Sequence, residues 1–350
     1  MNARDQQGLP DRIESEEQLD DVLTGPRPEL IGFSKSISSP LVILGAGGKM
    51  GPSLAVLAKR AAEAAGHRLD VIAISRFSDN RAREWLENHE IETRSCDLLD
   101  EQAVRKLPEA GNIIYLVGLK FGTAQNPAAT WAMNTIVPAR IMERYRTGRI
   151  VALSTGNVYP LSEVSRGGSN ETDPLTPLGE YPNAAVARER IFEFYSRERH
   201  TAVTLLRLFY AVELRYGVLV DIAEKVQTGE TIDLRNGYFN CIWQRDANEM
   251  VLRALALAAS PPSVWNLCRR EIFPVREAAL EFGQLLKRPP KFEGNEASTA
   301  LLGNSAPLCA KLGNPSVQLD AMLRWIAHWV KRGGRNLGRP THFEVRDGNY

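Results

Sequence analysis

The amino-acid sequence predicts an α/β protein built on a doubly wound parallel sheet, with a smaller C-terminal lobe beside it. Two observations predict this class. Short runs that suit buried strands alternate with helical stretches between residues 41 and 210. The first of these runs is followed at once by a glycine-rich loop and a helix. Alternation of this kind places parallel strands side by side, with crossover helices packed on both faces.

Each expected element rests on its own residues. The predicted strands are short apolar or β-branched runs, and they cover residues 41–44, 70–75, 91–95, 112–118, 149–154 and 202–210. The predicted helices carry apolar residues at helical spacing, and they cover residues 52–65, 80–89, 100–107, 128–146 and 183–198. Six strands joined in this way form a sheet of the Rossmann type.

The pattern divides the chain into four regions. A capping-box spacing from Ser15 to Gln18, with a stop at Gly25 and Pro26, predicts one short helix near the N-terminus. After residue 211 the alternation lapses, which indicates a second lobe partly threaded back on the first. The regions are an N-terminal extension (1–39), a Rossmann-type domain (40–210), a smaller lobe expected to bind the substrate (211–330) and a polar tail (331–350).

Composition limits the classes of partner. Of the 350 residues 43% are apolar and 24% are charged, and the net charge is only +1. A surface for nucleic acid or membrane needs a concentrated basic face, which this balance does not indicate. No run approaches the roughly 18 apolar residues of a membrane span. The N-terminus is polar and acidic, unlike a signal peptide, so we expect a cytoplasmic protein.

The cysteines and histidines indicate no metal site. Cys96, Cys241, Cys268 and Cys309 are widely spaced, without a CxxC pair or a nearby histidine. The five histidines are scattered and lack metal-ligand spacing. We therefore expect buried free thiols in a reducing compartment and no bound metal.

The loop "GAGGKMG" predicts a dinucleotide site. Gly45 allows a tight exit from the first strand, and Gly48 lets the backbone approach a pyrophosphate at the start of the next helix. Gly51 lets that helix pack close to the sheet. Lys49 and Met50 belong to the same loop and are expected to contact the cofactor. A glycine turn without a ligand is the alternative that the pattern leaves open.

The end of the second strand bears on the choice between the two nicotinamide cofactors. An acid there binds the ribose hydroxyls of NAD, but this strand ends with Ser75 and Arg76. An arginine pairs with a 2′-phosphate, and Lys49 adds a second cation. These residues favour NADP over NAD, while a solvated surface arginine is the alternative interpretation.

Several motifs follow one another in the order of a known family. They are "GAGGKMG", "CDLLD", "WAMNT", "VALSTGNVYP", "ETDPLTPLGEY", "LRLFYAVELRYGVL", "IWQRDANEMVLRAL" and "VWNLCRREIFPVREAALEF". In this order they resemble the extended short-chain dehydrogenase/reductase superfamily, and within it the NAD-dependent epimerase/dehydratase family. The resemblance covers roughly residues 41–330, and it is nearest to an uncharacterised bacterial branch with "GGKMG", "KFGT" and "STGNVYPL".

The resemblance implies an oxidoreductase or isomerase that binds NAD(P) and acts on a sugar or nucleotide-sugar. It implies that Asp97 and Leu98 contact the adenine, that Gly118 borders the cofactor, and that Asn134 supports the active-site framework. It also implies pairing of the helices in a homodimer. The residues expected near the substrate are Ser154, Asn157 and Arg207.

The catalytic pair implied by the resemblance is Thr155 and Tyr181. Thr155 positions the reacting oxygen, and Tyr181 exchanges a proton with it. A free tyrosine titrates at about pH 10, so the family uses a lysine one helical turn later to lower the tyrosine pKa and to hold the nicotinamide ribose. In this chain that position is Ala185.

Three hypotheses follow from Ala185. In the first, another cation takes the place of the missing lysine. Lys120 in "GLKFG" is preferred to Arg188, because Arg188 shares the helix face of Tyr181 but lies about 10 Å from it along the helix axis. In the second, catalysis uses another base or the charge of the cofactor. In the third, the protein is a catalytically silent NAD(P)-binding sensor or scaffold. A reductase of non-sugar carbonyl compounds remains a further, separate alternative.

Overall fold

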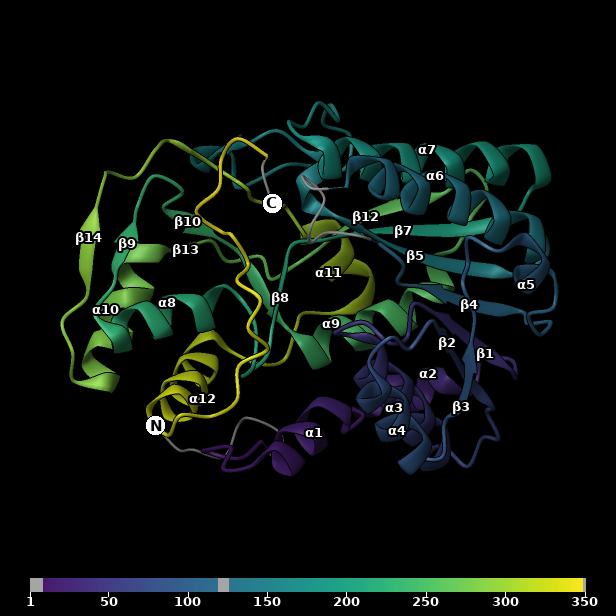
Figure 1. The fold of residues 1–350 in the computed structure, drawn as a ribbon, viewed down its shortest axis with the longest axis horizontal. Helices are drawn as coiled ribbons and strands as arrows, with labels where there is room; N and C mark the ends of the chain where they lie inside the picture. Colours follow the sequence, from purple (N-terminus) through teal and green to yellow (C-terminus); the bar gives the residue numbers. More distant parts are fainter. Residues whose placement is uncertain (1–8, 119–125, 349–350) are drawn as a thin grey trace.

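The computed structural model describes residues 9–118 and 126–348, and it confirms the predicted α/β class (Figure 1). In these residues a seven-stranded sheet has the order β12-β7-β5-β4-β1-β2-β3, and each neighbouring pair is parallel. The strands are β1 (Leu41–Leu44), β2 (Val71–Ser75), β3 (Glu92–Ser95), β4 (Asn112–Tyr115), β5 (Arg149–Thr155), β7 (Ala202–Leu208) and β12 (Ser263–Leu267). Their carboxyl ends therefore share one edge of the sheet.

The seventh strand is the main addition to the predicted sheet. β12 pairs in parallel with β7, from Ser263 opposite Thr204 to Leu267 opposite Leu208. It follows a Pro-rich turn and lies far along the chain from β7, so no alternation of strand and helix announces it. The chain thus re-enters the sheet after residue 211, while the predicted division into domains stays a prediction.

Helices cover both faces of the sheet. Alternate residues of β1 separate the two cores: Leu41 and Ile43 pack toward one face, and Val42 and Leu44 toward the other. The first face is covered by α2 (Pro28–Ser34), α3 (Gly51–Ala64) and α9 (Gln244–Arg253), with α4 (Asn80–Asn88) beside α3. The second face is covered by α5 (Glu101–Arg105), α6 (Pro127–Arg144) and α7 (Glu180–Arg199).

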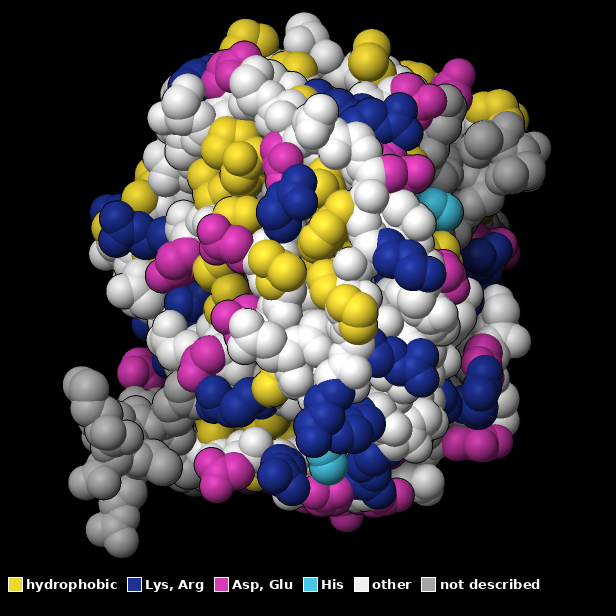
Figure 2. Space-filling view, turned by 90° about the vertical axis from the view of Figure 1, so that its left-hand side faces the viewer, with side chains coloured by type: hydrophobic (Ala, Val, Ile, Leu, Met, Phe, Trp, Pro, Cys, Tyr) yellow, Lys and Arg dark blue, Asp and Glu magenta, His cyan; other side chains and the backbone are white. Residues whose placement is uncertain are grey.

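A further core, separate from the two on the faces of the sheet, lies in the smaller lobe. It is formed mainly by α8 (Val218–Thr228), α10 (Val275–Leu286) and α12 (Leu319–Lys331). Shorter elements are β6 (Ser162–Glu163), β8 (Tyr210–Val212), β9 (Thr231–Asp233), β10 (Tyr238–Phe239), β11 (Cys241–Trp243), β13 (Phe273–Pro274), β14 (Lys291–Glu293), β15 (Thr299–Ala300) and α11 (Ala306–Leu312). On the outer face of this lobe, apolar and charged side chains of both signs are interspersed (Figure 2).

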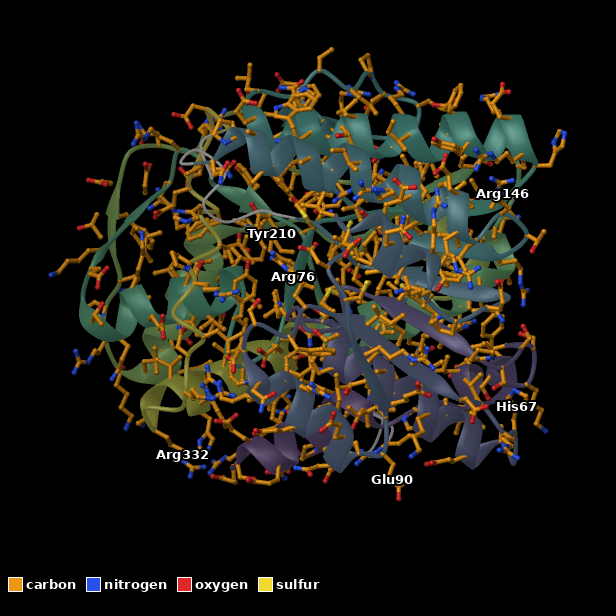
Figure 3. All side chains as sticks on the ribbon, turned by 45° about the vertical axis from the view of Figure 1, so that its right-hand side comes forward. His67, Arg76, Glu90, Arg146, Tyr210 and Arg332 are labelled. Carbon is orange, nitrogen blue, oxygen red and sulfur yellow. The ribbon has the colours of Figure 1, made fainter. Side chains whose placement is uncertain are left out.

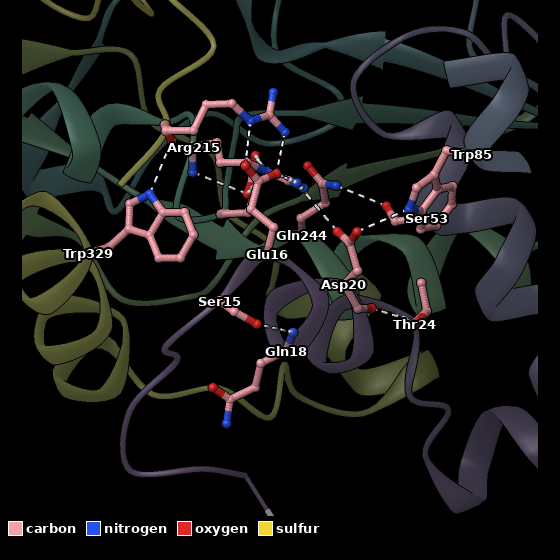
Figure 4. A network of polar contacts seen from close by, with 12 residues as sticks. Ser15, Glu16, Gln18, Asp20, Thr24, Ser53, Trp85, Arg215, Gln244 and Trp329 are labelled. Atoms are coloured by element: carbon pink, nitrogen blue, oxygen red, sulfur yellow. Dashed lines mark hydrogen bonds and ion pairs between the residues drawn. The ribbon is translucent and has the colours of Figure 1, made fainter. Parts of the chain in front are cut away.

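The N-terminal extension joins the two parts. The predicted short helix is α1 (Glu16–Thr24), and the Ser15 hydroxyl caps it by accepting from the Gln18 amide at 3.2 Å. Leu19 and Leu23 pack into the core of the smaller lobe. On the other side of α1, Asp20 accepts a hydrogen bond from the Trp85 indole on α4 at 3.1 Å (Figure 4). The helix α2 that follows was not predicted.

The C-terminal tail runs over the smaller lobe toward the sheet (Figure 1). The Thr341 amide donates to the Asp221 carboxylate at 2.8 Å, and the Arg346 guanidinium donates to the Thr299 carbonyl at 2.7 Å. Gly348 lies against Gly179: a Cβ added to Gly179 would stand 2.3 Å from the Gly348 carbonyl oxygen. The tail therefore reaches the segment that immediately precedes α7.

Three further observations concern the described residues. Within them no helix combines the length and the apolar character needed to cross a membrane. The four cysteines are buried and unbridged, as predicted. In the same part of the chain, no group of three or more His, Cys, Asp or Glu residues is placed to hold a metal ion.

The buried carboxyl group of Asp221 should make the folding stability depend on pH. Burial raises its pKa from 3.8 to about 6, although the Thr341 hydrogen bonds oppose this; Glu224 raises it further and Lys225 lowers it. Because the folded state holds this proton more tightly than the unfolded state, its contribution to stability is present below about pH 4 and is lost as the pH rises through about 6. The full effect is about 3 kcal/mol.

The test is the free energy of unfolding by urea at several pH values, compared with Asp221→Asn. The asparagine carbonyl still accepts from Thr341 but carries no charge. The variant should gain stability relative to the wild type as the pH rises from about 4 to about 7. Parallel pH curves for the two proteins would show that Asp221 does not titrate as proposed.

Candidate functional site

The carboxyl edge of the sheet gathers most of the predicted site residues. Gly45 follows β1, Ser75 ends β2, Gly118 follows β4 and Thr155 ends β5. Because β2, β1, β4 and β5 are adjacent parallel strands, these positions lie along one edge. Ligands of open α/β sheets bind outside this edge.

The glycine loop depends on close backbone packing. Gly45 has a φ of +81°, and a Cβ there would lie 3.1 Å from the backbone of Leu116 and Val117. A Cβ at Gly51 would lie 2.3 Å from the Ala46 carbonyl oxygen, so a side chain there would force the loop away from α3. The conformation thus requires glycine at both positions for packing alone.

The N-terminus of α3 is open toward the loop. Its N-cap residue, Met50, makes no side-chain capping hydrogen bond, and Gly47 and Gly48 are exposed. The Gly48 and Gly51 amides donate to carbonyls within the loop at 3.1 and 3.2 Å, so the remaining loop amides and the positive end of the helix dipole are what suit a phosphate group. The residues present therefore fit the pyrophosphate of a dinucleotide.

Lys49 reaches from this loop to the smaller lobe. Its ammonium donates to the Ala211 carbonyl on β8 at 2.6 Å and lies 4.1 Å from the centre of the Tyr216 ring. Burial raises the pKa of the Tyr216 hydroxyl. The lysine thus crosses between the two parts of the molecule beside the loop.

The residues expected at the adenosine end lie after β2 and β3. Arg76 is exposed and makes no hydrogen bond or ion pair through its side chain to any residue in 9–118 or 126–348. Figure 3 shows it near the middle of the molecule. Asp97 is exposed and accepts from the Leu99 amide at 2.9 Å, while Leu98 is buried. This end leaves one cation and one carboxylate accessible.

Thr155 lies at the start of a short turn with Asn157. The Thr155 hydroxyl donates to Oδ1 of the Asn157 side chain at 3.0 Å and accepts from the backbone N–H of Asn157 at 3.2 Å. Asn157 Nδ2 is buried and has no hydrogen-bond partner among the described residues. Unpaired buried donors are uncommon, so this amide group is available to a ligand.

Ser154 and Arg207 belong to a buried polar network. The Ser154 hydroxyl donates to Glu189 on α7, and Arg207 binds the same carboxylate with its closest contact at 2.7 Å. Arg207 also donates to the Tyr159 hydroxyl, whose pKa burial raises to about 12. Glu189 was not predicted from the sequence, although a carboxylate eight residues after Tyr181 on the same helix face was a usable signal. The substrate contacts of Ser154 and Arg207 stay predictions.

Helix α7 begins three residues earlier than predicted, after Gly179 with φ +90°. Tyr181 therefore lies in its first turn and is 7% exposed. Ala185 is fully buried and packs in an apolar cluster with Val158, Tyr159 and Phe209. The position of the expected lysine is thus filled by apolar packing.

The buried cation on this face of α7 is Arg188. It is 4% exposed, and its Nη1 donates to the Val117 carbonyl at 3.1 Å and to Asn134 Oδ1 at 2.9 Å. Its guanidinium therefore lies at the carboxyl end of β4. Lys120, the preferred substitute for the missing lysine, lies outside the described residues.

A surface pocket of about 330 Å³ lies elsewhere, between α7 and the β12 edge of the sheet. Its lining includes residues 171–175, Glu193 and Val264, together with Glu189 and Arg207 of the buried polar network, whereas Thr155, Tyr181 and the glycine loop do not line it. The pocket therefore adjoins the Glu189–Arg207 pair, while the predicted catalytic pair lies outside its lining.

Comparison with known proteins decides the family. The model of the NAD dependent epimerase/dehydratase family matches residues 41–267, which span the glycine loop, Thr155, Tyr181 and β12. The chain belongs to this family. The suspected resemblance is thereby confirmed.

Solved structures share the family fold. UDP-glucuronic acid 4-epimerase from Bacillus cereus in complex with NAD is 16% identical, with a TM-score of 0.70 over 84% of this chain and 99% of that one. The UDP-glucose 4-epimerase of Thermus thermophilus in complex with NAD is 17% identical, with a TM-score of 0.68 over 84% of this chain and 99% of that one. The UDP-Glc/GlcNAc 4-epimerase from Campylobacter jejuni is 18% identical, with a TM-score of 0.66 over 84% and 100%. No curated protein matches the chain.

The packing of Gly51 in this epimerase/dehydratase fold predicts the effect of adding one methyl group. Gly51→Ala should destabilise the protein by about 1–3 kcal/mol, because overpacking at the Ala46 carbonyl forces the loop to shift. It should also weaken nucleotide binding. Thermal unfolding and titration with NAD measure the two effects.

The matched control is Gly32→Ala. Gly32 lies in α2, and no atom lies within 4 Å of an added Cβ. That variant should be neutral or gain up to about 1 kcal/mol from helix propensity. Equal behaviour of the two variants would refute the close packing assigned to Gly51.

Proposed function

We propose that this protein is an NAD(P)-dependent oxidoreductase or epimerase that acts on a sugar or nucleotide-sugar. The carrying observation is that the open glycine loop and Thr155 lie along one sheet edge in a chain of this family. Helix α7, which bears Tyr181, packs on β5, the strand that Thr155 ends. Several structural neighbours are nucleotide-sugar 4-epimerases, which supports the same substrate class here.

In this proposal the glycine loop holds the pyrophosphate through backbone N–H groups at the start of α3. Asp97 and Leu98 border the adenine, and Gly118 borders the nicotinamide half. Arg76 pairs with a 2′-phosphate, which favours NADP, although two of the three structural neighbours reported above were solved with NAD. The exposure of Arg76, without a protein partner among the described residues, supports this preference.

The reaction needs a proton donor and acceptor from the chain. When bound, the nicotinamide supplies hydride transfer. The Tyr181 hydroxyl exchanges a proton with the substrate hydroxyl or carbonyl oxygen, and the Thr155 hydroxyl holds that oxygen in place. The low exposure of both side chains, 7% and 8%, limits the access of water to this proton.

One observation favours a different function, that of a silent NAD(P)-binding sensor or scaffold. Ala185 is fully buried among apolar side chains, so the position that carries a lysine in the resemblance carries no charge. We also propose that the chain pairs as a homodimer through α6 and α7. Exposed apolar side chains on these helices, Trp131, Ile136 and Phe194, support that arrangement.

Tyr181→Phe separates the enzyme from the sensor. With UDP-glucose, UDP-galactose and UDP-glucuronic acid as trial substrates, the variant should lose about 100-fold or more in kcat/KM and keep its cofactor affinity. Tyr195→Phe, a half-buried tyrosine on the same helix, serves as the control and should retain activity. Equal activity of wild type and Tyr181→Phe would rule out the assigned role. A wild type that binds NAD(P) but turns over no sugar would favour the sensor.

Arg76→Ala tests the cofactor preference. Loss of a charge-assisted contact to the 2′-phosphate should weaken NADP binding by about 10-fold or more and leave NAD binding nearly unchanged. The measurement is the dissociation constant of each cofactor by calorimetry. Equal affinity for the two cofactors, unaltered in the variant, would end the preference for NADP.

A further inference from the structure

Arg188 is a buried cation that the protein satisfies only in part. Its Nη1 makes both of the hydrogen bonds described above, to Val117 and Asn134. Its Nε is buried without a hydrogen-bond partner, and Nη2 makes no hydrogen bond to a residue in the described ranges. A buried N–H group without an acceptor is costly, and native proteins rarely leave one unless a ligand completes it.

The charge of Arg188 is also unpaired. No carboxylate of the described residues forms an ion pair with it, although Glu189 is its neighbour in sequence. Glu189 turns instead to Arg207. The same helix therefore holds one buried charge with a protein partner and one without, and the second is available to a hydroxyl-bearing or anionic ligand.

The place of this guanidinium is the centre of the sheet edge. β4 lies between β1, which leads into the glycine loop, and β5, which ends at Thr155. A Cβ added to Gly118 would lie 2.8 Å from Arg188 Nη1, so the glycine makes room for the guanidinium at the strand end. Helical side chains point back toward the helix N-terminus, which here is the end that carries Tyr181.

We propose that Arg188 is a cofactor-positioning residue, whose unpartnered N–H groups bind the ribose hydroxyls in the nicotinamide half of the dinucleotide. From position 188 it supplies the cationic hydrogen-bond donor for the ribose that Ala185, with its apolar side chain, cannot supply. The Val117 and Asn134 acceptors hold the guanidinium in place before the ligand arrives, which lowers the entropy cost of binding. The inference rests on the proposed function, because it assumes that the sheet edge binds a dinucleotide.

The experiment compares a whole dinucleotide with a fragment that lacks the nicotinamide ribose. Calorimetry gives dissociation constants of NAD and ADP, and of NADP and 2′-phospho-ADP, for the wild type and for three variants: Arg188→Ala, Arg188→Lys and Arg190→Ala. Arg190 lies on the same helix, exposed and paired with Glu193, and is the matched control. Circular dichroism and thermal unfolding establish that each variant is folded.

Arg188→Ala should weaken dinucleotide binding about 10- to 100-fold and fragment binding by less than about threefold. Arg188→Lys should recover most of the dinucleotide affinity, because it restores a cation that donates hydrogen bonds. Arg190→Ala should match the wild type for both ligands. If Arg188→Ala does not fold, Arg188→Lys and Arg188→Gln make the same comparison, with lysine retaining the affinity and glutamine losing it.

Two outcomes overturn the proposal while leaving the function intact. In one, the folded Arg188 variants bind dinucleotide as the wild type does. In the other, they lose dinucleotide and fragment affinity equally, which is the result of a purely structural role. A wild type that binds neither dinucleotide nor fragment overturns the proposed function itself, and this inference with it.

Discussion

The anchoring of α7 to the sheet by buried polar groups is the constraint on which the rest of the site depends. Glu189 binds Arg207 on β7 and accepts from Ser154 on β5, so one carboxylate joins the helix to two strands. Removing one partner of such a buried pair typically costs about 3–5 kcal/mol, because the other charge stays uncompensated. With the helix fixed in this way, its first turn and Tyr181 stay at the carboxyl edge.

A second constraint acts on the edge from outside. Gly179 precedes α7, and only a glycine fits there beside Gly348 of the tail. The tail is held in turn by Asp221 and Thr299 of the smaller lobe. The N-terminal helix α1 binds the same lobe to α4 through Asp20 and Trp85. Helix α1 and the described part of the tail therefore both connect the smaller lobe to the elements of the sheet domain.

Much of the candidate site was predictable because it consists of short motifs at strand ends. The glycine loop and the absence of an acid after β2 follow from residue type and local spacing alone, whereas Thr155 was implied by the family resemblance. Glu189, the role of Asn134 as an acceptor for Arg188, and the partial pairing of Arg188 did not. Each depends on which way a long side chain turns, and a helical repeat leaves that undecided.

The sequence by itself determined the fold class and six of the seven central strands, and it predicted the edge at which we propose that a dinucleotide binds. These follow from local periodicity, since strands and helices reveal themselves within about ten residues. Only the tertiary structure decided that β12 completes the sheet, that Gly348 of the tail lies beside Gly179, and that Arg188 rather than residue 185 brings a buried cation to the end of β4. Those outcomes depend on contacts between residues far apart in the chain, where packing and the pairing of buried charges select one arrangement that local spacing does not encode.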